Sequence, residues 1–428
     1  MTLEMHNKEQ GKVPGDRPFF YSPTKRLEKF MSKKNLCFLL LFFFVLHVLL
    51  PNQSLTLRND PSFGDDTDWV NLPLKEVITP LVVSPDGALF LADLDRHQIV
   101  RFDSSGKEES RFGQLGQGPG DLHYPELGGI LDNRFLIVAN YPLDQKISLF
   151  DLQGRFIRQI KTEHPCWKVI SLRKDIVAYN YKKFQQSARP EPFDRYTEYV
   201  FLKNIVTGLE KEVYRTDTTD KSKIRLSNNP SVSTKVGHFN PRLIMDVSPE
   251  GELWIGKSDS PRLSLYNESG DRIGTLEMEL HAEPVTRKHI ESLKNKTIND
   301  LKERMRLSHR TDHPFLKPFN SFDFSTLFDS HFPLYAGILP LPGNRLLVAP
   351  FPTTFQNENP LVFLLYSATG ILLKKLTIDS GEYSFYDSRP NLSRFAVTAR
   401  HLYALVNETT EDEDEHLRII RMPITCLD

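Results

Sequence analysis

Cysteine is scarce in this sequence: Cys37, Cys166 and Cys426 are the three among 428 residues. Exported domains that depend on disulfides for stability carry many more, so this usage excludes a disulfide framework. Cys166 and Cys426 could still pair in an oxidising compartment. The stability of the fold must therefore come from an apolar core.

Charge of one sign is not in excess either, because 54 basic residues stand against 55 acidic ones. Binding to nucleic acid needs a concentrated basic face. We therefore expect no nucleic-acid partner.

Long hydrophobic runs are absent apart from residues 36–50, whose 15 residues read LCFLLLFFFVLHVLL. A straight membrane-spanning helix needs about 20 apolar residues. Several basic residues precede the run and only Arg58 follows closely, which sends the rest of the chain across a membrane. The pattern predicts a cytoplasmic leader over residues 1–35 and a secretory signal or membrane anchor over 36–54. Because the leader is long, Met31 is a second candidate for the true start.

The motifs of common catalytic and metal sites are missing as well. The sequence has no G-x-S-x-G, no H-E-x-x-H and no G-x-x-x-x-G-K-[ST]. His309 and His313 are four residues apart, but Pro314 ends any helix there. The acidic run 411–415 lacks the spaced ligands of a calcium-binding loop. We can therefore name no catalytic residue and no metal ligand set, and we expect no cofactor, with calcium left open.

What the sequence does contain is one short repeated unit. VSPDGALFLA at 83–92 returns as VSPEGELWIG at 247–256, and each copy is followed by a second strand-like run and a Ser-Gly turn. The two turn glycines of each copy, Gly87 with Gly106 and Gly251 with Gly270, are 19 residues apart. Equal spacing in distant places indicates one folding unit used repeatedly.

Six copies of this unit fit between residues 69 and 428, each with alternating apolar runs, and the first five also have a tight glycine turn. They predict an all-β fold, a six-bladed β-propeller over 69–428. The sixth copy is one strand short, and the unpaired run 69–74 is expected to complete it and close the ring. An insertion over about 283–330 predicts an amphipathic helix between blades four and five, with Ile290, Leu293, Ile298, Leu301 and Met305 on its apolar face. The polar insertions 181–198 and 214–240 are expected to be long loops.

The connector FGQLGQGPGDLHYP at 112–125 resembles the inter-blade connector of NHL-repeat propellers. Residues 69–428 as a whole resemble exported bacterial six-bladed propellers of the NHL-repeat-like or TolB-like type. The resemblance implies fold and compartment more than activity, because related propellers include peptide-binding modules, calcium-dependent lactonases and a zinc-dependent lyase. Lactonase-type propellers hold calcium with Glu, Asn and Asp of inner strands, but no motif fixes such a role for Glu126, Asn240 or Asp246.

In a propeller, the loops that lead from an outer strand to the next inner strand line one mouth of the central channel. These loops carry aromatic, cationic and carboxylate groups that could form a ligand site. The candidate ligand-binding residues are Tyr124, Glu126, His164, Trp167, Arg242, Tyr335 and Arg394. The alternative is that they only cap the channel.

Three functions remain open at this point. The first is a non-catalytic binding module of the cell envelope that engages a peptide, glycan or protein at the channel mouth. The second is a metal-dependent hydrolase or lyase of the lactonase or amidating-lyase kind. The third is a structural role in the envelope, which fits an uncleaved anchor. In each case the propeller is expected to be periplasmic, envelope-bound or secreted, and to touch a membrane only through 36–50 if that segment is retained.

Overall fold

A computed structural model describes residues 54–64, 80–140, 145–185, 193–225, 233–235, 240–307, 322–352, 361–379, 392–409 and 415–424. The leader 1–35 and the hydrophobic run 36–50 lie outside these ranges. Within them, no helix is long and apolar enough to cross a membrane.

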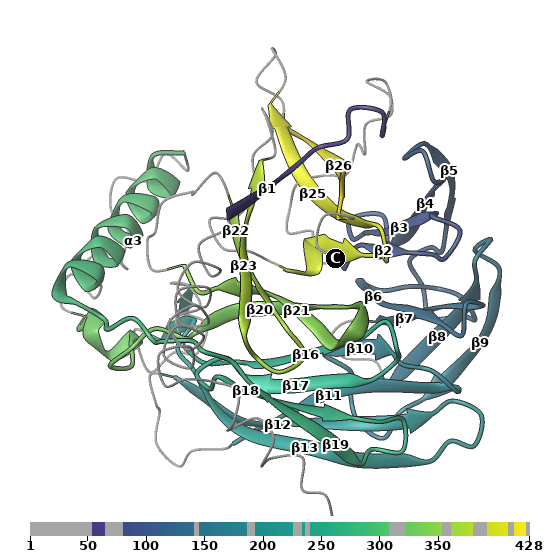
Figure 1. The fold of residues 1–428 in the computed structure, drawn as a ribbon, viewed down its shortest axis with the longest axis horizontal. Coiled ribbons are helices and arrows are strands. Elements are labelled where there is room, and N and C mark those ends of the chain that lie inside the picture. Colours follow the sequence, from purple (N-terminus) through teal and green to yellow (C-terminus); the bar gives the residue numbers. More distant parts are fainter. Residues whose placement is uncertain are drawn as a thin grey trace, which may run out of the picture. The chain divides into compact units, whose positions relative to one another are not determined.

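Six β-sheets follow one another in chain order as the blades of a propeller, which confirms the predicted fold (Figure 1). Each strand pairs with the next along the chain, so the sheets are antiparallel meanders. The strands, from inner to outer, are β2 (Val82–Val83), β3 (Leu89–Asp93), β4 (Gln98–Phe102) and β5 (Glu108–Phe112) in blade one; β6 (Pro125–Leu131), β7 (Phe135–Asn140), β8 (Lys146–Asp151) and β9 (Phe156–Lys161) in blade two; β10 (Lys168–Ser171), β11 (Ile176–Phe184), β12 (Asp194–Asn204) and β13 (Glu210–Asp220) in blade three; β16 (Leu243–Val247), β17 (Leu253–Lys257), β18 (Arg262–Tyr266) and β19 (Arg272–Glu277) in blade four; β20 (Tyr335–Leu341), β21 (Arg345–Pro350), β22 (Leu361–Tyr366) and β23 (Leu372–Asp379) in blade five; and β24 (Phe395–Val397), β25 (His401–Thr409) and β26 (Glu415–Pro423) in blade six.

The repeated turns adopt the same geometry in both clear copies. In blade one, Ser84 N–H donates to Ala88 O at 2.8 Å and Gly87 N–H to Ser84 O at 2.9 Å. The same two bonds join Ser248 to Glu252 and Gly251 to Ser248 in blade four, each at 2.8 Å. Gly87 and Gly251 have φ of 90° and 82°, a region that glycine enters without strain. The sequence repeat is therefore a structural repeat.

The core is divided into six apolar clusters, one between each pair of neighbouring blades. One of them joins the last blade to the first, with Leu405 and Ile419 of blade six against Leu89 and Val100 of blade one. Because this cluster is continuous, the ring is closed by hydrophobic burial.

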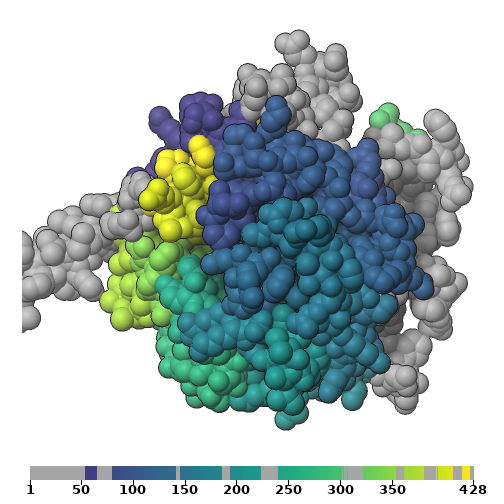
Figure 2. Space-filling model, turned by 90° about the vertical axis from the view of Figure 1, so that its right-hand side faces the viewer, coloured from purple at the N-terminus to yellow at the C-terminus, as the bar shows by residue number. Residues whose placement is uncertain are grey.

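The segment 54–64, which we call the closing segment, also spans the junction of the ring. Its strand β1 (Ser54–Arg58) pairs in parallel with β23 at the outer edge of blade five. Asp60 N–H then donates to Arg421 O in blade six at 2.7 Å, and Gly64 N–H donates to Ser105 O in blade one at 2.9 Å. Figure 2 shows this segment in purple beside the C-terminal strands in yellow. The predicted pairing of 69–74 with blade six falls outside the described residues.

The inserted helix α3 (Arg287–Leu307) follows β19 of blade four and precedes β20 of blade five, as predicted. Leu293 is buried against Phe324, Leu327 and Phe332 of the segment that follows the helix. Phe324 and Leu327 belong to the short helix η2 (Phe324–Leu327). The apolar stripe thus packs against the segment that follows it, and Phe193 and Phe351 of blades three and five join the same cluster. The side chains of Leu301 and Met305 lie outside the described set.

Blade three differs from the prediction, because parts of both polar insertions are strand. β11 continues to Phe184, β12 begins at Asp194 and β13 continues to Asp220, so blade three has the longest described strands. A small hairpin of β14 (Lys223–Arg225) and β15 (Ser233–Lys235) follows. Cross-strand pairs such as Tyr181 with Tyr199 stabilise polar strands that show little hydrophobic alternation.

Candidate functional site

The inner strands β2, β6, β10, β16, β20 and β24 surround a central cavity of about 1240 Å³. All six blades contribute to its wall, so the cavity is the channel of the propeller. Ligand sites of small molecules typically measure about 300–1,000 Å³. The channel can therefore hold a small organic ligand together with water.

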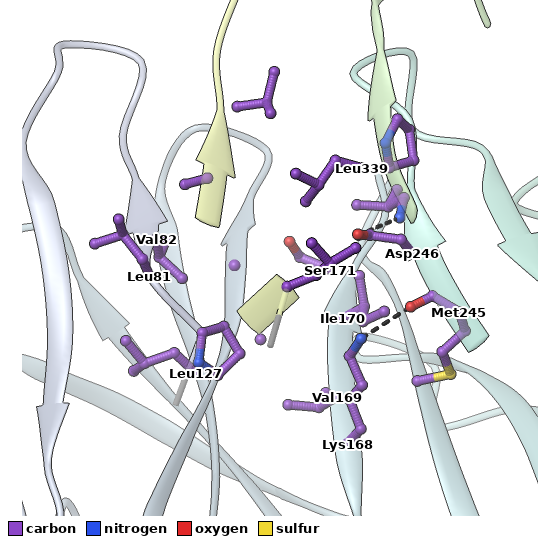
Figure 3. Close-up of a pocket in the computed structure, with 18 of the residues that line it drawn as sticks. Leu81, Val82, Leu127, Lys168, Val169, Ile170, Ser171, Met245, Asp246 and Leu339 are labelled. Atoms are coloured by element: carbon purple, nitrogen blue, oxygen red, sulfur yellow. Dashed lines mark hydrogen bonds between the residues drawn. The ribbon is translucent and has the colours of Figure 1, made fainter. Parts of the chain in front are cut away.

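The middle of the channel, which we call the waist, is apolar. Figure 3 shows side chains from separate blades around it, among them Val82 of β2, Leu127 of β6, Val169 and Ile170 of β10 and Leu339 of β20. Inner strands of a propeller pack between two neighbouring blades, so they consist largely of apolar residues. These side chains are largely buried between blades, and partly exposed residues of the wall such as Val83, Ile130 and Val397 offer the apolar surface to a ligand.

Three ionisable side chains interrupt this apolar wall on adjacent blades: Glu126 on β6, Lys168 on β10 and Asp246 on β16. Lys168 Nζ donates a hydrogen bond to Met245 O at 2.9 Å and so crosses from blade three to blade four (Figure 3). Asp246 Oδ1 accepts from the N–H of Val247 at 2.8 Å. Within the described part of the chain, the Glu126 carboxyl group makes no hydrogen bond.

The channel changes the acidity of both carboxyl groups. Glu126 is half-buried and the surface it retains faces the cavity, where loss of hydration raises its pKa to about 8, against the opposing charge of Lys168. Burial also raises the pKa of Asp246, opposed by Lys168 and by the Val247 N–H bond. Glu126 is therefore mainly protonated at neutral pH. Carboxyl groups with shifted pKa values in a cavity are candidates for binding or acid–base chemistry.

A second polar group extends the cavity along blade three. Lys182 Nζ lies 3.4 Å from Glu198 Oε1, and stands 5.0 Å from the ring centroid of Trp167 and 4.7 Å from that of Tyr196. The Glu198 side chain is 4% exposed. Lys182 and Glu198 compensate each other's charge, so this part of the cavity wall is polar but close to neutral.

Four of the seven residues predicted from the sequence line the cavity: Tyr124, Glu126, Trp167 and Arg242. Arg242 is exposed and also ties blade four to blade five, because its Nη2 donates to Ala336 O at 2.5 Å. Tyr124 is 47% exposed and packs against the rings of His97 and His123. These four come from blades two, three and four and the loops that lead into them.

The other three residues do not line the cavity. His164 stacks on Tyr181 with ring centroids 4.5 Å apart. Tyr335 is fully buried between blades four and five, and its hydroxyl donates to Lys257 O at 3.2 Å. Arg394 is 7% exposed and directed into the protein. The loops before the inner strands lie near the mouth, but Tyr335 is already the first residue of β20, whose alternation turns its side chain away from the channel. Arg394 ends the short helix η4 (Leu392–Arg394) directly before β24, and its side chain is buried there.

Sequence reasoning did not assign Lys168, Lys182 or Glu198 to the site, and it considered Asp246 only for calcium. A usable signal existed for two of them. Lys168 and Asp246 are the charged residues of the otherwise apolar strands KVIS and LIMDV. A charge inside an inner strand must face the channel or be neutralised, since burial without a partner is costly. Lys182 and Glu198 lie in parts of β11 and β12 that were predicted as a loop.

No group of three or more His, Cys, Asp or Glu side chains that could hold a metal ion occurs among the described residues. Asn240 does not line the cavity, and its amide donates to Thr219 O at 3.1 Å. His309, His313 and most of the acidic run 411–415 lie outside the described ranges, as does Cys426. Cys166 is a free, buried thiol.

Comparison with known proteins gives no family. No protein-family model matches the chain, and no curated protein matches it. The finer resemblance to NHL-repeat propellers therefore stays a prediction.

Solved structures with a similar chain path include a "putative exported protein" from Bacteroides fragilis, 10% identical with a TM-score of 0.43, where the match covers 86% of this chain and 99% of that one. A member of the DUF4221 family from Bacteroides vulgatus is 12% identical with a TM-score of 0.44, and the match covers 86% and 97%. A gluconolactonase from Xanthomonas campestris is 10% identical with a TM-score of 0.39, covering 81% and 85%. At these values the similarity concerns the chain path and carries no activity over to this protein.

Proposed function

We propose that the chain is an exported propeller that acts as a non-catalytic binding module of the cell envelope and takes its ligand in the central channel. The observation that carries the proposal is the channel itself: a cavity of about 1240 Å³ with an apolar waist and a cluster of charged groups on three adjacent blades. Export rests on the basic leader and the hydrophobic run 36–50. A peptide, a glycan or a protein segment are the partner classes that such a mouth could accept.

The test uses the full-length chain and a mixture of small metabolites and short peptides, with bound compounds identified by mass spectrometry after equilibrium dialysis. Ala396→Trp would fill the waist, since Ala396 lines the cavity. Ile273→Trp is the matched control, because Ile273 lies on the outer strand β19 and is 50% exposed. We expect compounds that are retained by the wild type and by Ile273→Trp and lost with Ala396→Trp. Equal retention by all three proteins would contradict binding in the channel.

A hydrolase or lyase is the second candidate, and one observation favours it. A protonated Glu126 with Lys168 nearby is the kind of arrangement that general acid catalysis uses. The same dialysis experiment separates the two functions. Retained compounds that leave the protein unchanged support a binding module, whereas compounds recovered in cleaved or eliminated form support an enzyme.

A further inference from the structure

The cluster at Glu126 and Lys168 has unused hydrogen-bonding capacity that faces the cavity. Lys168 Nζ has three N–H bonds, and among the described residues its one hydrogen-bond acceptor is Met245 O. The Glu126 carboxyl group has no hydrogen-bond partner there. Both groups belong to the wall of one cavity and to neighbouring inner strands, β6 and β10. A ligand that pairs with both groups would gain hydrogen bonds that are stronger at this partly desolvated wall than in water.

Lys168 supplies the positive charge of this cluster. Glu126 is mainly protonated at neutral pH, so the charge of Lys168 is not cancelled from that side. Arg242 adds a second positive group on the cavity wall, and Lys182 is compensated by Glu198. Asp246 faces Lys168 from β16, and its pKa is raised as well. Asp95, Asp132 and Glu250 are further carboxylates of the wall, and all three lie in loops beyond the inner strands. Asp132 accepts N–H bonds from Lys174 and Asp175, and Glu250 accepts one from Gly343. At the position between Glu126 and Lys168, the ammonium repels a cationic ligand group and attracts an anionic one.

We infer that the ligand of the channel is an organic carboxylate with an apolar body, whose carboxylate lies between the Glu126 carboxyl group and the Lys168 ammonium while its apolar part lies against the waist. The inference rests on the proposed function and names the ligand class of the same site. Glu126 donates its proton in a hydrogen bond to the ligand, and Lys168 supplies the compensating charge. The carboxylate can belong to a small organic acid or to the C-terminus of a peptide, since the chemistry of the two is the same.

The first test compares matched probes by isothermal titration calorimetry on the full-length chain at pH 7. One set is 4-phenylbutyrate, its amide and 4-phenylbutylamine; the other is N-acetyl-Ala-Leu with a free or an amidated C-terminus. We expect at least one carboxylate to bind at least tenfold more tightly than its amide, about 1.4 kcal/mol. The set that binds identifies the source of the carboxylate. Preference for the amine or amide, or no carboxylate binding up to about 10 mM, would overturn the inference. If the dialysis experiment still finds compounds that the wild type retains and Ala396→Trp loses, the inference about the carboxylate fails but the proposed function stands.

The second test uses pH. The bound carboxylate needs protonated Glu126, so wild-type affinity should fall about tenfold per pH unit above about 8. Glu126→Gln mimics the protonated acid and should keep the affinity at pH 7 within about threefold while removing this pH dependence. Glu163→Gln, an exposed carboxylate outside the cavity wall, should retain the wild-type profile. Affinity that rises with pH, or that Glu126→Gln abolishes at pH 7, would show that Glu126 binds as a carboxylate and would overturn the inference.

Discussion

The turn glycines of the blades do not all have the same environment. Gly370 in blade five and Gly208 in blade three both have positive φ, 83° and 77°. A Cβ atom on Gly370 would overlap the carbonyl oxygen of Glu277 in blade four, whereas a Cβ on Gly208 would meet nothing within 4 Å. Position 370 thus requires glycine because of its positive φ and because blades four and five approach each other there. Position 208 favours glycine because of its positive φ alone.

We predict that Gly370→Ala lowers the free energy of unfolding by about 3–4 kcal/mol, because strain at positive φ and a clash with backbone add together. Gly208→Ala should lower it by about 1 kcal/mol through strain alone. Urea denaturation of the two variants measures the difference. Equal losses would show that the contact between Gly370 and Glu277 imposes no constraint.

Among the elements, the closing segment 54–64 has the most specific role at the junction of the ring. Arg421 of β26 donates through Nη2 to Asp60 Oδ2 at 2.7 Å, and its guanidinium lies 4.6 Å from the ring centroid of Phe63. Phe63 is 1% exposed within the cluster that joins blades six and one. The segment thus stabilises this junction through buried apolar surface and a charge-assisted hydrogen bond.

Asp60 makes the junction sensitive to acid. Hydrogen bonds from Ser62 and Arg421 lower its pKa from 3.8 to about 2. A lowered carboxyl pKa stabilises the folded state above pH 4, and this contribution is lost as the pH falls from about 4 to 2. We predict that Asp60→Asn costs about 1 kcal/mol at pH 7, because the pair is only partly buried, and almost nothing at pH 2.

Urea denaturation at both pH values is the measurement. Asp329→Asn, which removes an ion pair with Lys221 far from the closing segment in sequence, controls for general effects of charge. A cost that persists at pH 2 would contradict the role of the ionised carboxylate.

At the scale of the whole molecule, six blades of one design surround a channel whose wall is not symmetric. Charged groups gather on blades two to four, and blades one, five and six contribute mainly apolar residues to the waist. The chemistry of the channel wall therefore differs from blade to blade.

We predict that the full-length protein, purified without chelator, carries no stoichiometric calcium or zinc. The physical reason is that the Lys168 ammonium interacts with both Glu126 and Asp246, so it supplies the positive charge that a cation would bring. Elemental analysis by mass spectrometry before and after chelation measures this. One ion per chain that is lost with the chelator would contradict the prediction and favour the metal-dependent enzyme.

The repeat architecture could be predicted from the sequence because its causes are local. A glycine such as Gly87 at positive φ and a run such as 89–92 determine a hairpin whatever surrounds them. The same reasoning failed for the extensions of β11 to β13, which were predicted as loops and where pairs such as Tyr181 with Tyr199 replace hydrophobic alternation. Segment 54–58 was likewise not predicted as a strand, because its pairing partner β23 is more than 300 residues away in the chain.

The sequence by itself thus determined the number of blades, their order and the inserted helix, because hairpins and amphipathic helices form from neighbouring residues. Tertiary structure alone decided the composition of the site. It brought Glu126, Lys168 and Asp246 from three blades to one cavity, and directed Tyr335 and Arg394 into the protein. The physical reason is that a side chain's position relative to the channel depends on strand register and on the packing of neighbouring blades, neither of which a single repeat contains.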